Sequence, residues 1–391
     1  MKQADIQKYQ NNITALAVHL SFAKRITAPI MMPFYRALGL SYSQIGILSS
    51  LVYWSDSLLE VIGGAFSDVY GRKKTSLLYA TLGMICMTLF ALGHSFAVFA
   101  VANVVYGTAI AIGSGNASSL LYDTLCVLGW ERQYKKYRGR IQFPPKVING
   151  FVLLLVPILY QWHMKYPFWL GVLFYLISFL TALRIAEPPR AANTERRIAS
   201  TITDAWSEIR SNRGVIKALM REVLFGSFIL LMFEYYQPLL AIAGVPLAIT
   251  GVVYTLARVL EGLGSLWLHT LERHNDATLL RANALLIISL LIGIAATGRF
   301  WLLALIPLVS LLDGATDVLI GDVLNKQISS ANRTTIQSTG NMLQGFFYAG
   351  LLLVCGVASD HFGVQPMFGL AAVGFLILLG VLGLYKTDTH A

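Results

Sequence analysis

The sequence predicts an all-α membrane protein with twelve transmembrane helices in two similar six-helix bundles, and three observations lead to that fold class. Apolar residues make up 56% of the 391 residues and charged residues only 13%, against about 25% charged residues in soluble domains. The apolar residues fall in runs long enough to cross a bilayer as helices. The two halves of the chain also share short sequence patterns in the same order.

Apolar runs of about 20 residues give the expected spans. They cover residues 13–35, 43–66, 75–93, 96–118, 145–161, 167–187, 222–242, 248–270, 279–297, 300–322, 336–358 and 367–385. The polar segment 1–12 lacks the short cleavable apolar core of a secretory signal. We therefore expect the first run to be retained as a span. The even number of spans places both termini on one side of the membrane.

The Lys and Arg residues in the loops and at the loop-facing ends of the spans set the expected orientation. With both termini in the cytoplasm, 23 of them lie in inner segments, whereas only Arg36, Lys165 and Arg299 lie in outer loops. The sequence thus predicts a multi-pass protein of the bacterial inner membrane. Its net charge of +10 is explained by basic inner loops beside anionic lipid, so we expect no nucleic-acid partner.

The cysteines and the loop patterns exclude several other classes. Cys86, Cys126 and Cys355 stand singly within or beside apolar runs, which fits neither a disulfide framework nor a metal site. We expect no metal and no cofactor. A nucleotide-binding loop of the G-x4-G-K-[S/T] type is absent, which argues against direct drive by ATP.

The longest inner connection divides the chain into three expected parts. Residues 1–190 form the first six-helix bundle, residues 191–221 a cytoplasmic linker, and residues 222–391 the second bundle. The motif Glu187-Pro-Pro-Arg190 ends the sixth helix. Within the linker, residues 200–212 have a helix-compatible pattern that suits a helix on the membrane surface, and a flexible tether is an equal alternative.

Weak self-similarity indicates that the second bundle repeats the first. Gly39 and Gly46, seven apart, enter the second span, and Gly244 and Gly251 enter the eighth at an offset of 205 residues. Under that offset Asp56 aligns with Glu261. The segments Arg138-Gly-Arg-Ile-Gln142 and Arg333-Thr-Thr-Ile-Gln337 also match, at an offset of 195.

The clearest motif is the inner loop Gly64-Ala-Phe-Ser-Asp68-Val-Tyr-Gly71-Arg72-Lys73-Lys74. Glycines at 63, 64 and 71 permit close helix approach and a tight turn. Asp68, at a helix end beside three cations, suits a charge network that breaks and re-forms. The ordered spacing makes a chance Asp in an ordinary basic loop a poor explanation.

This loop resembles the signature of the major facilitator superfamily, and the twelve-span layout extends the resemblance over the whole chain. Ser114-Gly-Asn-Ala-Ser-Ser-Leu-Leu-Tyr122-Asp123 and Arg333-Thr-Thr-Ile-Gln-Ser338 resemble a bacterial subgroup. Gly356-x3-Asp360-x2-Gly363 looks like that subgroup's exit from the eleventh helix. The resemblance implies alternating access by two rocking bundles, with Asp68 and Arg72 latching the cytoplasmic side. The expected gate residues are Glu60, Gly64, Asp68, Gly71, Arg72 and Lys73.

Three departures bear on what the resemblance implies. Proton-coupled exporters of the superfamily carry an Arg early in the fourth helix, where this chain has Asn103-Val-Val-Tyr-Gly107. Their Gly-Pro-rich fifth helix is reduced here to Gly150 and Pro157. The duplicate loop after the eighth span, residues 264–273, has also lost the motif. The first two differences leave the simple antiporter assignment open, and the third implies that any latch at that loop is degraded.

Ionisable residues in mid-span cost several kcal/mol each, about 2.5–3.5 on insertion scales, and are functional candidates by default. The candidates for substrate binding or proton coupling are Lys24, Arg25, Asp56, Glu234, Tyr235, Arg258, Glu261, Asp313 and Asp317. Arg258 and Glu261, three apart, could instead form a structural pair on their own helix. Asp313 and Asp317 have no cation on their helix, and two carboxylates this close favour holding a proton.

The remaining charges suggest the shape of the substrate site. Lys24 and Arg25 are adjacent and expected halfway along the first helix, about 100° apart, so at least one should face a cavity. There it would meet Asp56 or an anionic group of the substrate. Glu234 in Phe233-Glu-Tyr-Tyr-Gln-Pro238 is expected on a cavity wall, because lipid would not tolerate this polarity.

The sequence therefore predicts a secondary transporter, not an enzyme, for a small organic solute that is anionic or amphipathic. Its expected partners are that solute, protons and membrane lipid, and a monomer is expected. Efflux is favoured over the alternative, a proton-coupled uptake permease for an anionic metabolite or siderophore-like compound. A membrane enzyme acting on lipid is a distant alternative, because Asp313-x3-Asp317-x4-Asp322 lacks the aspartate cluster that binds a metal diphosphate.

Overall fold

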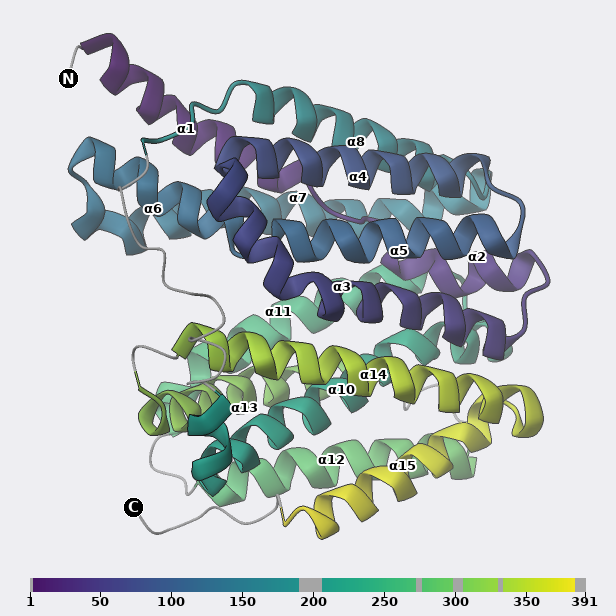
Figure 1. The fold of residues 1–391 in the computed structure, drawn as a ribbon. Coiled ribbons are helices and arrows are strands. Elements are labelled where there is room, and N and C mark those ends of the chain that lie inside the picture. The colour runs from purple at the N-terminus through teal and green to yellow at the C-terminus, as the bar shows by residue number, and fades with distance from the viewer. Residues whose placement is uncertain (1–2, 190–205, 272–275, 298–304, 330–332, 384–391) are drawn as a thin grey trace. The chain divides into compact units, whose positions relative to one another are not determined.

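The computed structural model describes residues 3–189, 206–271, 276–297, 305–329 and 333–383, and every regular element within these ranges is a helix (Figure 1). The helices pack as two compact units. The first unit comprises residues 1–31 and 51–194, and the second comprises residues 32–50 and 195–391. Helix α3 (Tyr42–Tyr70) begins in the second unit and continues into the first.

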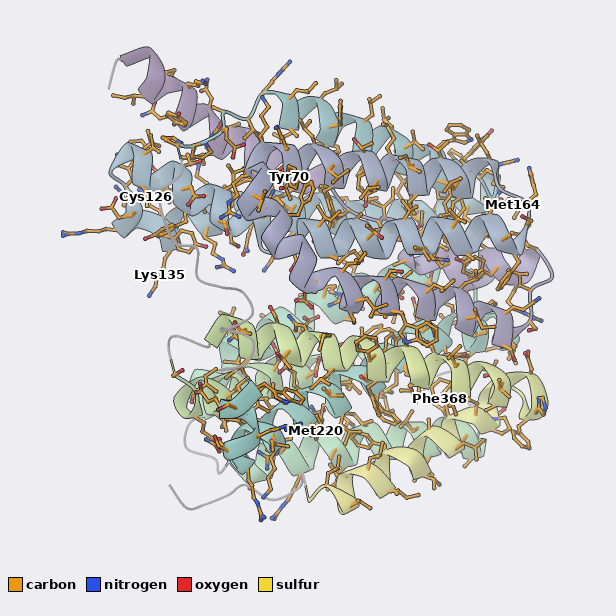
Figure 2. The ribbon with its side chains drawn as sticks, viewed as in Figure 1. Tyr70, Cys126, Lys135, Met164, Met220 and Phe368 are labelled. Atoms are coloured by element: carbon orange, nitrogen blue, oxygen red, sulfur yellow. The ribbon has the colours of Figure 1, made fainter. Side chains whose placement is uncertain are left out.

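In the first unit, α4 packs between α5 and α8, while α1 packs against α6, α7 and α8. These helices are α1 (Gln3–Phe22), α4 (Arg72–Leu92), α5 (Phe96–Gly113), α6 (Asn116–Leu128), α7 (Tyr134–Trp162) and α8 (Tyr166–Leu183). Lys135, from a predicted inner segment, and Met164, from a predicted outer loop, lie at opposite ends of this unit (Figure 2).

In the second unit, α10 packs against α13 and α14, α11 packs against α13, and α12 packs against α15. These helices are α10 (Arg213–Ile242), α11 (Ala248–Leu271), α12 (Asp276–Thr297), α13 (Ile306–Gln327), α14 (Arg333–Phe362) and α15 (Val364–Val381). Phe368 on α15 is completely buried in this unit (Figure 2).

Seven helical segments among the described residues are long and apolar enough to cross a membrane. They are α4, α5 with α6, the segment Glu131–Trp162 containing α7, α8, α12, α14 and α15. The other five predicted spans correspond to α1 with the short helix α2 (Met31–Ala37), and to α3, α10, α11 and α13. These five carry the ionisable residues that the sequence places inside the membrane.

The first predicted span is not one helix, so the expectation that Lys24 and Arg25 lie along a continuous helix is wrong. Helix α1 ends at Phe22, and regular structure resumes with the 3-10 turn Ala28–Ile30 before α2. Pro29 explains the interruption. It has no N–H to donate to the carbonyl of Arg25, and its ring would clash with the preceding turn.

Close contacts at glycines recur in both units at matching places. A β-carbon at Gly63 on α3 would overlap the carbonyl oxygen of Ala111 on α5. A β-carbon at Gly264 on α11 would likewise overlap the carbonyl oxygen of Leu311 on α13. Gly107 and Gly314 make the reciprocal contacts, against Val52 and Glu261. Small residues of this kind let membrane helices pack backbone to backbone.

The turn glycines support the same repeat. Gly39 and Gly244, which precede the second and eighth predicted spans, have φ angles of 79° and 70°. This left-handed region favours glycine because it has no β-carbon. The two halves therefore share turn conformation as well as sequence pattern.

The described end of the predicted linker is helical and belongs to the second unit. Residues 206–211 are helical, and α10 already begins at Arg213. Ile209, 7% exposed, joins a buried apolar cluster with Val215, Leu280 and Ile336. The earlier part of the linker, 191–205, lies outside the described residues.

We predict that Gly264→Ala destabilises the protein by about 1–3 kcal/mol, the usual range for overpacking, because the new methyl group would collide with the α13 backbone. Thermal unfolding of the purified protein measures this. Gly262→Ala is the matched control, since no atom lies within 4 Å of a β-carbon there. Equal unfolding temperatures for the two variants would contradict the proposed close packing of α11 and α13.

Candidate functional site

The second unit contains a cavity of about 300 Å³ that is rich in acidic side chains. This volume is at the lower end of the range typical of ligand pockets, about 300–1,000 Å³. The cavity brings together four of the predicted site residues, Arg258 and Glu261 from α11 and Asp313 and Asp317 from α13. The lining is completed by Glu222, Phe225, Gly226, Ile229, Leu230, Phe233, Ser265, Ser310, Gly314, Thr316, Ile320, Asn341 and Gln344.

The close glycine contacts between α11 and α13 fix the relative positions of these four charged residues. Gly314 lies directly against the backbone of Glu261, so the acidic turn of α13 faces the charged turn of α11. Asp313 and Asp317 are one turn apart and share a helix face. The Arg258 guanidinium donates to the Glu261 carboxylate at 2.7 Å, the pairing within one helix that the sequence left as an alternative.

Glu222 is a cavity residue that the sequence analysis did not single out. It was placed at the start of the seventh span, next to Arg221, where a charged residue is ordinary. Helix α10 in fact begins at Arg213, so Glu222 lies well inside the helix, and its carboxyl interacts electrostatically with that of Asp317. The signal available in the sequence was an acidic residue at the edge of an apolar run.

Glu234 and Tyr235 are placed elsewhere in the second unit. The Glu234 carboxylate accepts a hydrogen bond from Ser49 on α3 at 3.1 Å. Tyr235 is 1% exposed, and its ring centroid lies 6.4 Å from that of Tyr42. From this stretch of α10, Phe233 is the residue that lines the cavity.

In the first unit, Arg25 lies in the interruption after α1 and turns toward α4 and α5. Its guanidinium carbon is 5.2 Å from the ring centroid of Phe90 and 4.9 Å from that of Tyr106. The guanidinium also donates to the side-chain oxygen of Asn103 at 3.4 Å. Asn103 is the residue that stands where exporters of the superfamily carry Arg, so a guanidinium from the first span reaches this position. Lys24 is exposed.

Asp56 and Glu60 lie one turn apart on the part of α3 that belongs to the first unit. Both side chains are partly buried, and their carboxyl groups interact electrostatically. The backbone of α3 at Asp56 is held against Gly107 of α5. This close contact fixes the position of Asp56 along the bundle.

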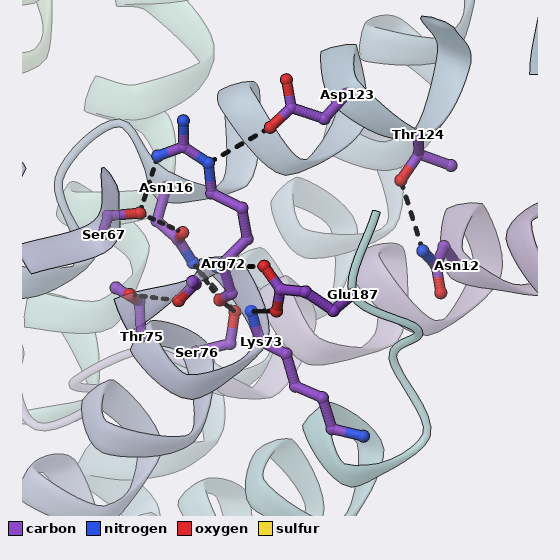
Figure 3. Close-up of polar contacts among 11 residues, drawn as sticks. Asn12, Ser67, Arg72, Lys73, Thr75, Ser76, Asn116, Asp123, Thr124 and Glu187 are labelled. Carbon is purple, nitrogen blue, oxygen red and sulfur yellow. Dashed lines mark hydrogen bonds and ion pairs between the residues drawn. The ribbon is translucent and has the colours of Figure 1, made fainter. Parts of the chain in front are cut away.

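A polar network surrounds Arg72 at the predicted cytoplasmic end of the first unit (Figure 3). The Arg72 guanidinium donates to the Asp123 carboxylate at 3.2 Å and to the Ser67 hydroxyl at 2.7 Å. Asn116 accepts from Ser67 at 2.8 Å and donates to the Arg72 carbonyl at 3.1 Å. Two motifs that are distant in sequence, residues 64–74 and 114–123, therefore meet here.

Glu187 completes this network from the segment that follows α8. Its two carboxylate oxygens accept the backbone N–H groups of Arg72 and Lys73 at 2.7 and 2.8 Å (Figure 3). These are the first two residues of α4, where the helix leaves N–H groups without intrahelical partners. The Lys73 ammonium donates to the carbonyl of Leu183 at 2.6 Å. From the sequence, Glu187 was expected only to end the sixth helix, and its contact with α4 was not predicted.

The other predicted gate residues are described in part. Gly71 has a φ of 105° and directly precedes α4, as the predicted tight turn requires. Gly64 and Asp68 lie on the helical backbone of α3, but the Asp68 side chain is outside the described part of the structure. The predicted contact between Asp68 and Arg72 remains a prediction.

A second carboxylate holds the start of another helix, in the second unit. Asp360, near the end of α14, accepts the backbone N–H groups of Tyr42 and Ser43, each at 2.8 Å. These residues begin α3. A β-carbon at Gly356 would come within 2.6 Å of the Tyr42 carbonyl oxygen, so the absence of a side chain there permits the contact.

Comparison with known proteins agrees with this architecture. A sequence profile of the Major Facilitator Superfamily matches residues 14–349. The chain is 22% identical over 172 residues to the quinolone resistance protein NorA of Staphylococcus aureus. That match covers 43% of this chain and 42% of NorA.

Solved structures of transporters share the fold over nearly the whole chain. A variant of the nucleoside transporter NupG superposes with a TM-score of 0.79 at 14% identity, covering 96% of this chain and all of the other. The D-xylose-proton symporter superposes with a TM-score of 0.73 at 13% identity, covering 97% of each chain. These structures show the shared fold, and the family profile that matches residues 14–349 shows that the chain belongs to the Major Facilitator Superfamily.

Proposed function

We propose that this protein is a secondary active transporter that moves a small organic solute across the bacterial inner membrane by alternating access, coupled to protons. The acid-lined cavity of the second unit carries this proposal. Among the described residues, Glu222, Asp313 and Asp317 make no ion pair, although they lie within a membrane-spanning bundle. In this setting a carboxyl group must bind a proton or a cation, or meet water, to offset its desolvation.

Proton coupling follows from how these acids interact. Asp313 interacts electrostatically with Asp317, Glu261 and Arg258, and Asp317 also interacts with Glu222. Like charges at this range disfavour simultaneous ionisation, so the group takes up and releases protons as it is exposed to either side. Asp313, which interacts both with Asp317 and with the two residues of the ion pair, is the main proton carrier in this proposal.

Efflux is the proposed direction of transport. The similarity to a quinolone resistance protein supports export. The absence of the exporter arginine at Asn103 weighs against it, but the Arg25 guanidinium at that residue supplies a cation at the same place. Solute, protons and lipid are the proposed partners of a monomer with both termini in the cytoplasm.

The second candidate is proton-coupled uptake of an anionic metabolite or siderophore-like compound, and the position of Arg25 is the observation that favours it. Its partly buried guanidinium lies at an interruption of the first span. Irregular backbone at membrane depth is tolerated where it lines a cavity or is buried in protein. In transporters, interrupted helices of this kind commonly contribute to ligand sites.

We propose that the two carboxylate contacts at helix starts act as latches. Glu187 holds the start of α4 on the inner side, beside the Arg72–Asp123 ion pair, and Asp360 holds the start of α3 on the outer side. Each contact joins a carboxylate to N–H groups at the positive end of a helix, which contributes about 0.3–1 kcal/mol or more. Contacts of this strength can form and break within a transport cycle.

We predict that Asp313→Asn abolishes proton-coupled transport, because an amide cannot carry the proton. The measurement uses everted vesicles with a proton-gradient dye and a panel of anionic and cationic solutes. Wild-type vesicles should lose part of the gradient on addition of at least one solute, and Asp313→Asn vesicles should not. Asp322→Asn, on the same helix but outside the cavity lining, is the control. Proton coupling is wrong if no solute changes the gradient and solute transport survives its collapse.

We predict that Glu187→Gln slows transport several-fold, because the amide offers one acceptor in place of the carboxylate that holds the first two N–H groups of α4. Charge-assisted hydrogen bonds contribute about 1.5–3 kcal/mol each, and partial exposure reduces that amount here. Solute flux and thermal unfolding are measured in parallel. Lys74→Gln is the control, since Lys74 is an exposed charge in the same first turn of α4. A flux loss equal to that of the control would refute the latch.

We predict that Arg25→Gln weakens binding of an anionic substrate at least tenfold if the uptake candidate is right, because the cation facing that substrate is lost. Equilibrium binding of the anionic solutes from the panel measures this, with Lys24→Gln as the adjacent control. Unchanged binding would remove the anion-site candidate and leave the acid-lined cavity as the substrate site.

A further inference from the structure

The charges around the cavity of the second unit are strongly unbalanced. Glu222 comes from α10, Arg258 and Glu261 from α11, and Asp313 and Asp317 from α13, whereas α14 contributes the uncharged Asn341 and Gln344. Arg258 is already paired with Glu261. Three carboxyl groups therefore face the cavity with no basic side chain paired to them among the described residues.

The rest of the lining is apolar and partly aromatic. Phe225 and Phe233 line the cavity together with Ile229, Leu230 and Ile320. Aromatic faces attract cations, whereas aliphatic side chains favour the hydrocarbon part of a ligand. The cavity thus combines negative charge with a surface suited to a hydrophobic body.

A buried hydroxyl provides an independent sign of a ligand. Ser310 lines the cavity and is 2% exposed, yet its Oγ has no hydrogen-bond partner in the part of the chain that the structure describes. Buried polar groups in folded proteins almost always have partners, so this oxygen is available to a polar group that enters the cavity.

A bare metal ion does not fit this arrangement. Among the described residues, no three His, Cys, Asp or Glu side chains are grouped closely enough to hold a metal. The acids are distributed over three helices around a volume of about 300 Å³. Such a spread suits an ammonium group carried on an organic body.

We infer that the cavity binds an amphipathic organic cation, with its positive charge among Glu222, Asp313 and Asp317 and its apolar or ring-bearing part against Phe225 and Phe233. This inference names the substrate class of the proposed transporter and rests on that function. Protons and the cation compete for the same carboxylates. Protonation of the acids on one side of the membrane then releases the cation there, which gives exchange of the solute for protons.

Equilibrium binding of two permanently charged probes to the purified full-length protein tests the inference. The probes are benzyltrimethylammonium and benzylsulfonate, which share a ring and differ in the sign of their charge. We expect only the cation to bind at pH 8. Its dissociation constant should rise as the pH falls, by up to about tenfold per pH unit for each proton displaced. Glu222→Gln and Asp313→Asn should each weaken binding at least tenfold, whereas Asp322→Asn should not.

The orphan hydroxyl allows a finer test with a third probe, benzylammonium, whose N–H groups can donate to Ser310. We expect Ser310→Ala to weaken benzylammonium about three- to tenfold, the range for one hydrogen bond, and to leave benzyltrimethylammonium unchanged. Equal losses for both probes would show that the substitution disturbs packing and would overturn the role of Ser310.

The outcomes separate this inference from the proposed function. Binding of benzylsulfonate but not of the cation, no cation binding at all, or cation binding indifferent to Glu222→Gln and Asp313→Asn would each overturn the cation site. None of these results bears on whether vesicles show solute-dependent proton movement. Cation binding without proton movement in vesicles would instead support the site and refute proton coupling.

Discussion

The cost of placing ionisable groups inside a bilayer is the constraint on which this structure depends. Five of the twelve spans carry such groups, and several of these groups meet the cost in a recognisable way. Arg258 pairs with Glu261 on its own helix at 2.7 Å. Arg25 lies against the rings of Phe90 and Tyr106. Glu222, Asp313 and Asp317 face a cavity instead, where a proton, a cation or water offsets the cost. The apolar spans form the scaffold of the fold, and the charged spans carry the ionisable side chains whose protonation or pairing can change.

A short sequence pattern with a carboxylate contact to helix N–H groups occurs twice in the chain. The segments Gly64 to Gly71 and Gly356 to Gly363 both follow the pattern G-x2-S-D-x2-G. Each closes a long helix, and each last glycine, with a φ of 105° or 89°, precedes the next helix. In the second copy the carboxylate of Asp360 holds two N–H groups at the start of α3. Beside the first copy, Glu187 does the same for α4. A carboxylate at a helix start forms a contact strong enough to order a loop and weak enough to release it.

The sequence could predict what depends on local pattern. Apolar runs predicted the helices, and the loop motif predicted the turn at Gly71 and the superfamily. It could not predict contacts that join distant segments, such as Arg72 with Asp123 or α4 with Glu187. Glu222 was missed because α10 starts at Arg213, well before the apolar run, so this acid was assigned to the first residue of the span. The interruption at Lys24 and Arg25 was missed although Pro29 was visible, because a proline in a long apolar run is compatible with a kinked but continuous span.

The two candidate sites, Arg25 and the acid-lined cavity, favour substrates of opposite charge. The choice between them depends on whether the protein itself already stabilises the charge at each site. Arg25 already has a hydrogen bond to Asn103 and two aromatic faces, and cation–π contacts contribute about 0.5–2 kcal/mol each. Its charge is therefore stabilised without a ligand. The three cavity acids have no ion-pair partner within the described residues, and Ser310 beside them has no hydrogen-bond partner. A ligand gains most free energy where the protein has left groups unsatisfied. The acid-lined cavity is thus the stronger candidate for the proposed substrate site, and its unpaired acids are the reason we propose a cation as the substrate.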